Sequence, residues 1–452
     1  MSRCTHSCLV ADHVCMSRAW LWWLLLGLVV GGIIVKQYVV RSRMAKSGVG
    51  GGAPLEASCR YAVGAAGILP EGQMGRADAI ADMLRNIEQT ARGDRDHARL
   101  VPVIAELSGP EAAVERIDVL LAEGSDVMAE LGILRRIYAT KSGAAADAFE
   151  RTRLHERLGW TGELATTFGQ DDLDAERKQV LGVARRTIVI VGIMVLLVFV
   201  AFMVGLTLFV IACVKFKRGT LSWAYRPPPA DPSDVVWLQG VVLLLVVLLG
   251  IEVVPALFDK PPPDEFRFAI WGVALLVFYP LVRGVGWRTW REDTGWHRGG
   301  GVFREIGAGI VGYLACLPIV ALGFVATSFL AQYTNEQLSH PIFEAPHSGS
   351  HAAFVFSLYL AAAVWAPLVE ETVFRGALYR YLRGRSSGWI AAPIIGVIFA
   401  AVHPQGFAAI PALAAIGASF VLLRQWRASL IAPMTAHALH NAVLVTLVVT
   451  LL

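Results

Sequence analysis

The sequence predicts an all-α fold: a polytopic transmembrane helix bundle of about eight or nine spans with an inserted soluble helical domain. Three observations predict it. Of the 452 residues, 55% are hydrophobic and only 17% are charged, which is typical of a membrane protein with some soluble mass. Long apolar runs recur along the second half of the chain. Residues 55–180 instead mix charged and apolar residues with helical periodicity.

Composition also excludes some functions. The net charge of +4 is small, so we expect no nucleic-acid partner. Three of the six cysteines lie in residues 1–18, together with His6 and His13. Their spacing matches no zinc motif well, and the cysteines as a set do not indicate a disulfide framework. We expect this N-terminal tail to be disordered.

Residues 19–40 are predicted to form an anchor transmembrane helix. The run from Ala19 to Val35 is rich in Trp and Leu, which a signal peptide also shows, but no convincing small-residue cleavage site follows it. Basic residues follow it instead, and we therefore expect an uncleaved anchor. These basic residues are Lys36, Arg41, Arg43 and Lys46.

Residues 55–180 are predicted to form a soluble domain of short helices. Gly109-Pro110 and Gly124-Ser125 separate stretches in which apolar residues recur three or four positions apart. The domain shows no catalytic constellation, so we expect it to have a regulatory role or to dock a protein partner. Its periodic residues are Ile80, Met83, Leu84 and Ile87, then Val114, Ile117, Leu120 and Leu121, then Val127, Leu131, Leu134 and Tyr138.

Most of the remaining chain is predicted to lie in the membrane, with transmembrane helices in residues 187–345 and a further core in residues 350–452. Two of the expected spans, Phe268–Val282 and Trp389–Val402, are shorter than the roughly 20 residues that cross a bilayer. The full set is Thr187–Cys213, Val235–Phe258, Phe268–Val282, Ile306–Ala331, Ala352–Leu368, Trp389–Val402, Phe407–Leu423 and Leu430–Leu452.

Arginine-rich loops alternate with loops that have few basic residues, as expected if the basic loops are cytoplasmic. The same alternation places residues 55–180 outside and the N-terminus inside. The basic residues just after the anchor favour the opposite orientation, so the sequence leaves the side of the soluble domain open.

An acidic motif stands at the end of the apolar run Ala352–Leu368. Charges there are costly and mark functional sites by default. Glu371 and Arg375 are four residues apart and can pair on one helix face. Glu370 lies about 140° around the axis from Arg375 and is less neutralised by it, which suits a general base or acid. The alternative is a structural ion pair with Glu370 facing water.

Two later membrane segments add histidines. His403 ends a short apolar helix, and His437 and Asn441 share a face of the last one. Taken singly, such residues are more often structural. Counted from the arginine-rich loops, however, Glu370 and His403 lie about 22 Å deep, Asn441 about 21 Å and His437 about 15 Å. This similar depth predicts one shared site.

These motifs resemble the three motifs of the CPBP (Abi) family of intramembrane metalloproteases. That family includes the type II CAAX prenyl endopeptidases and bacterial proteins of bacteriocin processing and immunity. The resemblance covers roughly residues 350–445 and implies a protease core that acts on membrane-associated proteins or peptides in a bacterial cytoplasmic (inner) membrane. The motifs are Glu370-Glu371-xxx-Arg375, Phe399-xxx-His403 and His437-xxx-Asn441.

The resemblance implies a catalytic set of Glu370, Glu371, His403 and His437. Arg375 and Asn441 would support this set. Two chemistries fit it. Zn²⁺ held by His403, His437 and a glutamate, Glu371, would acidify a bound water. Alternatively, Glu370 and His403 activate water directly while His437 and Asn441 stabilise the oxyanion. No His-Glu-x-x-His zinc motif occurs.

We therefore expect an intramembrane endopeptidase that depends on a metal ion. One alternative is a non-proteolytic membrane interaction or immunity protein that retains the protease fold. Another is a transporter or proton path, which would place polar residues along several helices. Here they gather at one depth, and the other spans are nearly bare apart from Glu252.

Overall fold

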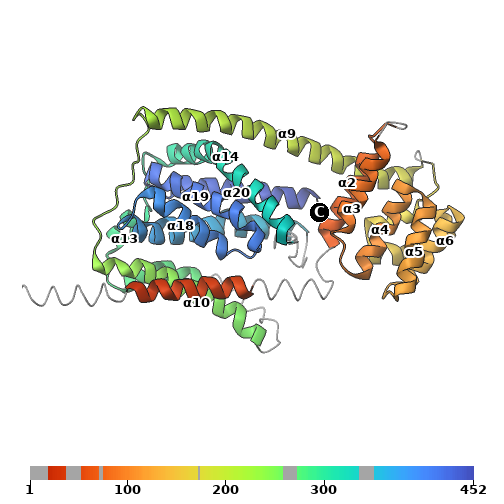
Figure 1. Ribbon diagram of the computed structural model, residues 1–452, viewed down its shortest axis with the longest axis horizontal. Coiled ribbons are helices and arrows are strands. Elements are labelled where there is room, and N and C mark those ends of the chain that lie inside the picture. The colour runs from red at the N-terminus through yellow and green to blue at the C-terminus, as the bar shows by residue number, and fades with distance from the viewer. Residues whose placement is uncertain are drawn as a thin grey trace, which may run out of the picture. The chain divides into compact units, whose positions relative to one another are not determined.

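The computed structural model describes residues 19–36, 52–70, 75–171, 174–257, 272–334 and 351–451, and every regular element in these ranges is a helix. The predicted all-α bundle is confirmed (Figure 1). Seven of the described helices are long and apolar enough to cross a membrane. They are Ala19–Lys36, Ala175–Lys217, Pro232–Ile251, Val302–Thr334, Ala352–Arg383, Phe407–Arg427 and Ile431–Thr450.

The two short expected spans differ from the other seven. Gly388–Ala401 (α18) is an apolar helix of 14 residues. The described part of 268–282 is instead a 3-10 helix, Ala274–Phe278 (η3), followed by the short helix Tyr279–Val282 (α12). Pro280 has no amide hydrogen and its ring crowds the preceding turn, so a continuous α-helix does not run through this segment.

The chain divides into two compact units, which are described separately. One comprises residues 1–40 and 199–446, and the other residues 41–198 and 447–452. Helix α9, Ala175–Lys217, contributes to both and is continuous over 43 residues. Its first turns carry charges and its remainder is apolar. The change from polar to apolar sequence near residue 187 therefore falls within a helix and not in a loop.

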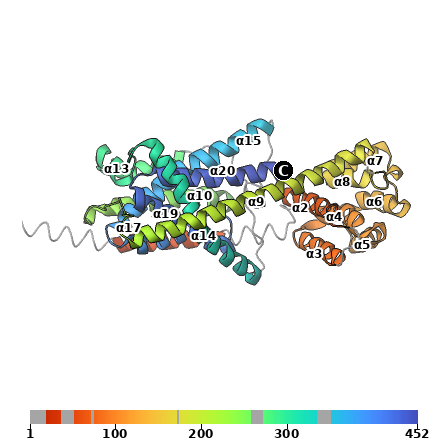
Figure 2. The same cartoon turned by 90° about the horizontal axis from the view of Figure 1, so that it is seen from above.

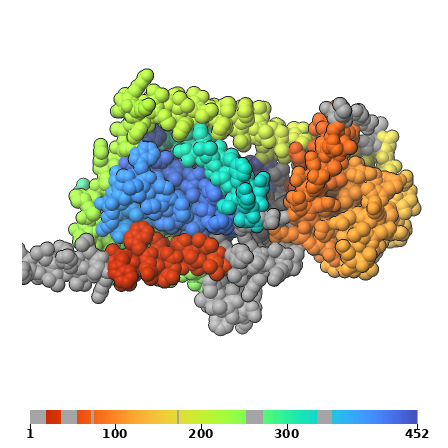
Figure 3. Space-filling model, viewed as in Figure 1, coloured from red at the N-terminus to blue at the C-terminus, as the bar shows by residue number. Residues whose placement is uncertain are grey.

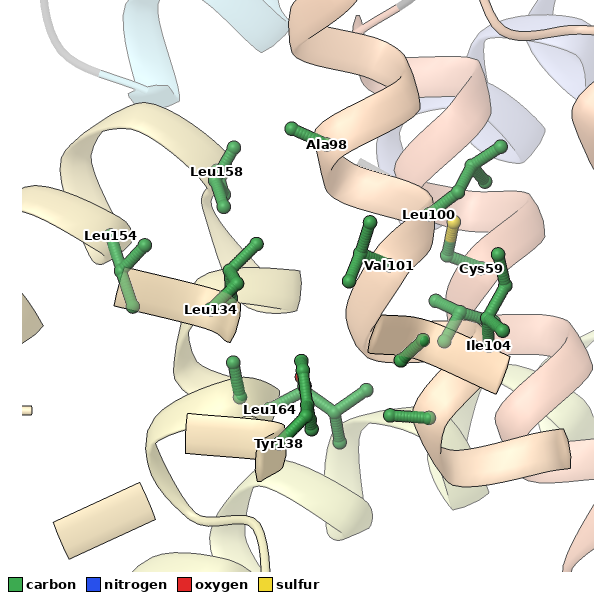
Figure 4. Packing of buried hydrophobic residues seen from close by; sticks show 14 of the residues in the cluster. Cys59, Ala98, Leu100, Val101, Ile104, Leu134, Tyr138, Leu154, Leu158 and Leu164 are labelled. Carbon is green, nitrogen blue, oxygen red and sulfur yellow. The ribbon is translucent and has the colours of Figure 1, made fainter. Parts of the chain in front are cut away.

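The unit of residues 41–198 and 447–452 has an apolar core of its own, built from short helices (Figure 4). Most of the residues predicted from periodicity are buried there: Ile117, Leu131 and Leu134 are 0% exposed, and Tyr138 packs edge-on against Phe168. The helices are α2 (Gly52–Ala66), α3 (Arg76–Glu88), α4 (Gly93–Ser108), α5 (Pro110–Glu123), α6 (Met128–Thr140), α7 (Ala148–Leu158) and α8 (Trp160–Thr166).

In the membrane unit, α14 (Val302–Thr334), α18, α19 (Ile410–Arg427) and α20 (Ile431–Leu451) lie side by side (Figures 1 and 2). Small residues let their backbones approach closely, as is usual between membrane helices. A Cβ atom added at Gly396 would lie 2.5 Å from the carbonyl oxygen of Ala414. The position of α18 against α19 is thereby fixed.

The helix Ala19–Lys36 lies along one side of the membrane unit (Figure 3). Its buried residues Leu26, Val29 and Ile33 share one apolar cluster with α10 (Val235–Leu257) and with Phe374. The anchor and α10 therefore border the helix that carries the acidic motif. The N-terminal tail, with its cysteines and histidines, lies outside the described residues.

Candidate active site

The acidic motif lies on a helical run that twice departs from α-helical geometry. π-helical segments, Leu360–Trp365 (η5) and Thr372–Leu378 (η6), flank α16, Ala366–Glu371. Pro367 occupies the first turn of α16 directly after the first of them, where its missing amide hydrogen is tolerated. π-helical turns are rare and often occur at functional sites.

Glu371 and Arg375 form a fully buried ion pair, as their spacing predicts. Arg375 Nη1 donates to Glu371 Oε1 over 3.0 Å, and both side chains are 0% exposed. The second Arg375 nitrogen, Nη2, donates to the carbonyl of Gly417 on α19 over 2.7 Å. The guanidinium also lies 4.5 Å from the ring centre of Phe399. These contacts tie three helices together behind the acidic motif.

Glu370 faces both predicted histidines. Its Oε2 atom lies 3.6 Å from His403 Nε2 and 3.8 Å from His437 Nε2. The three residues come from separate helical segments: Glu370 lies in the last turn of α16, His403 follows α18 and His437 lies on α20. The convergence predicted from their depth in the membrane is therefore present.

Both imidazole rings are oriented from behind. His403 Nδ1 is 2.5 Å from the carbonyl oxygen of Phe399, which can only accept, so this nitrogen is the donor. His437 Nδ1 is 2.8 Å from Glu371 Oε1 and makes the equivalent bond. In the neutral rings, the Nε2 lone pairs consequently face Glu370. Pro404 terminates the helical turn that ends at His403 and thus holds this residue at the helix end.

Three hydrogen-bond acceptors, Glu370 Oε2, His403 Nε2 and His437 Nε2, thus face one another with no donor among them. Glu370 Oε2 is buried and has no hydrogen-bond partner among the described residues. Leaving such an atom unsatisfied is costly. A proton, a water molecule or a cation placed among these atoms would satisfy them.

The donor set suits a metal ion in chemical type, although it is not tightly gathered. Within the described ranges, no three His, Cys, Asp or Glu side chains form a ready metal-ion site. Two imidazole nitrogens and a carboxylate oxygen are nevertheless ligands that Zn²⁺ prefers. The carboxylate expected here, Glu371, is bonded to Arg375 and to the rear nitrogen of His437. Glu370, and not Glu371, is the carboxylate that faces the Nε2 atoms of His403 and His437.

Asn441 bonds the backbone of a neighbouring helical segment. Its Nδ2 atom donates to the carbonyl of Ala362 in the first π-helical segment over 2.7 Å. The neighbouring His440 lies 2.9 Å through Nδ1 from the hydroxyl of Tyr313 on α14. His437, His440 and Asn441 lie close together on one helix, so their positions in the sequence do not show which of them faces Glu370 and which bonds another helix.

A cavity of about 290 Å³ opens beside Glu370 and His403. Its other walls are mainly apolar and come from α10, from η3 and from the anchor helix, through Ile33. Sequence reasoning missed these segments as parts of the site. Only hydropathy marks them, and hydropathy does not distinguish a cavity wall from a lipid-facing surface.

A family model described as type II CAAX prenyl endopeptidase Rce1-like matches residues 352–443. This part of the chain is an Rce1-like domain. It contains all six residues predicted for the site, and the match agrees with the family resemblance that the motifs indicated. Neither the curated proteins nor the solved structures contain a match to the chain. The Rce1-like domain and the apolar helices around it make the chain an integral membrane protein.

Proposed function

We propose that this protein is an intramembrane endopeptidase of a bacterial cytoplasmic membrane that hydrolyses peptide bonds of membrane-associated proteins or peptides. The observation that carries the proposal is the convergence of Glu370, His403 and His437 at the edge of an apolar cavity within an Rce1-like domain. Apolar walls suit a substrate that approaches from the membrane, and the polar end supplies groups that activate water.

In this mechanism, one water molecule lies between Glu370 and His403. Water has two O–H bonds, and these two side chains offer an acceptor each. Glu370 Oε2 removes a proton as the water oxygen attacks the peptide carbonyl, and the proton then passes to the leaving amine. Glu371 acts indirectly, because it holds the ring of His437 and is itself held by Arg375.

In the alternative mechanism, Glu370, His403 and His437 would hold a divalent ion such as Zn²⁺ in place of the direct contacts to water. When bound, it would supply a Lewis acid that polarises the peptide carbonyl. Metal analysis of the purified protein tests this part separately from activity. We expect one equivalent in the wild type and a loss in His403→Ala. Equal metal content in both proteins would contradict the assignment of His403 as a ligand.

The central test is cleavage in liposomes of a library of quenched fluorescent peptides with apolar segments. We expect Glu370→Gln and His403→Ala each to lower the rate by at least about 100-fold, the usual contribution of a positioned acid or base. Both variants should still accumulate in the membrane. Cleavage at the wild-type rate would refute the site. If the wild type also cleaves no peptide while its phenotype survives both changes, the non-proteolytic alternative is favoured.

A further inference from the structure

The π-helical segment η5, which precedes Glu370, ends with a backbone carbonyl that loses its usual donors. The N–H of Ala366 bonds to the carbonyl of Ala361, five residues back, and so passes over the carbonyl of Ala362. The next residue is Pro367, which has no amide hydrogen and offers no bond in its place. Because buried backbone carbonyls are almost always bonded, Ala362 calls for a donor from another part of the chain.

The segment η6, which follows Glu370, ends in the same way. The N–H of Tyr379 bonds to the carbonyl of Phe374, five residues back, and to that of Gly376, three residues back. It thereby passes over the carbonyl of Arg375, which would accept this bond in an α-helix. Both π-helical segments thus end with a carbonyl that lacks the bond from four residues ahead.

Side chains of two other helices donate to these two carbonyls. Asn441 on α20 donates to Ala362 over 2.7 Å, and Arg424 on α19 donates through Nε to Arg375 over 3.2 Å. Each passed-over carbonyl therefore receives one donor from a separate helix. This repeated arrangement indicates that Asn441 and Arg424 have a common role at the two π-helical segments.

Arg424 is a costly residue to bury at this position. Its side chain is 0% exposed and lies within a candidate membrane span, Phe407–Arg427. Its other bonds also go to backbone carbonyls, those of Asp293 (over 3.0 Å) and Ala428, and it forms no ion pair with a described residue. A buried charge of this kind within a membrane span indicates a specific function.

Glu370 lies between the two π-helical segments, on α16. A π-helical turn accommodates one residue more than an α-helical turn, so its loss would rotate the adjoining residues by about 100°. Such a rotation would take Glu370 Oε2 away from His403 and His437, which lie 3.6 and 3.8 Å from it. We propose that Asn441 and Arg424 are positioning residues that hold the two π-helical segments and thereby direct Glu370 at both histidines. This inference rests on the proposed function.

The first test compares crystal structures of the full-length wild type, Asn441→Asp and Arg424→Met. Asn441→Asp keeps the size of the side chain and removes its N–H donors, and Arg424→Met removes the donors from α19. We expect the affected π-helical segment to become α-helical and Glu370 to move by more than about 1.5 Å, the rise of one residue. Unchanged π-helical segments in both variants would overturn the proposal. This test does not depend on activity, so it still decides the positioning role if the wild type cleaves no peptide and the proposed function fails.

The second test measures cleavage kinetics in liposomes. Both variants should lower kcat about 100-fold, the cost of misplacing a catalytic group by about 1 Å, and leave KM unchanged because the cavity walls are intact. Thr446→Val is the matched control and should keep the wild-type kcat, because Thr446 also lies on α20 but bonds Tyr359 outside both π-helical segments. A loss of kcat in Asn441→Asp with unchanged π-helical segments would overturn its positioning role and would favour direct stabilisation of the oxyanion.

Discussion

At the residue scale, the last membrane helix carries two histidines with different surroundings. His437 faces Glu370 and Glu371, whereas His440 bonds Tyr313 on a neighbouring helix. Because the two differ by only three positions, composition and hydropathy alone do not separate their roles. The geometry assigns the chemistry to the first and helix packing to the second.

This difference gives a matched pair of variants. We expect His437→Ala to abolish peptide cleavage and His440→Ala to retain most of it, with a loss of about 1 kcal/mol of stability from the missing hydrogen bond. Cleavage rates in liposomes and thermal unfolding in detergent measure the two effects. The reverse pattern, with an inactive His440→Ala and an active His437→Ala, would contradict the assignment.

The sequence predicted the Glu371–Arg375 pair because one helix contains both residues at a spacing of four. Depth from the loops also predicted that Glu370, His403 and His437 would converge. The same spacing indicated Glu370 as the less neutralised carboxylate, and Glu370 is the one that faces the ring nitrogens. The prediction of Glu371 as a metal ligand did not anticipate its bonds to Arg375 and to His437. The bond from the Asn441 amide to a backbone carbonyl was not predicted, because it depends on helix rotation and on a π-helical turn that no residue pattern marks.

At the element scale, the site depends on how closely α18 packs on α19. Gly396 on α18 faces Ala414 and Gly417 on α19, and the carbonyl of Gly417 accepts a bond from Arg375. Packing and site geometry are therefore coupled through one short contact. Hydropathy predicted that α18 is apolar and short. It did not predict this contact, because the contact depends on the neighbouring helix.

We expect Gly396→Ala to lower the free energy of unfolding by about 1–3 kcal/mol, since its Cβ atom would meet the backbone of α19. Cleavage should fall with it. Gly307→Ala, on α14, is the control because no atom lies within 4 Å of the added carbon. It should be neutral or slightly stabilising. Thermal unfolding of both variants checks this, and equal stability would argue against close α18–α19 packing.

At the scale of the whole molecule, composition alone indicated a helical part distinct from the apolar helices, and a compact unit of residues 41–198 and 447–452 is present. Periodicity identified much of the apolar core of this unit, because each short amphipathic helix buries one face. Periodicity did not predict that α9 would run unbroken from that part into the membrane unit. The change of residue type near position 187 indicated a boundary, although no helix-breaking residue stands there.

Cys59 reports on the folding of the unit of residues 41–198 and 447–452 within the full chain. Its thiol is 0% exposed, and burial raises its pKa to about 12. A raised pKa leaves little reactive thiolate at pH 7.5. We expect a maleimide to spare Cys59 in the native protein and to label it in urea, as read by peptide mass spectrometry. An exposed Glu123→Cys control should label in both. Rapid native labelling of Cys59 would contradict a packed core.

A double-mutant cycle on peptide cleavage shows whether Glu370 and His403 act on the same water molecule, as proposed. Groups that act as one unit show strongly non-additive losses. We expect the variant that combines Glu370→Gln with His403→Ala to cleave no more slowly than the worse of the two single variants. Losses that multiply in the double variant would contradict it and would mean that the two residues act independently.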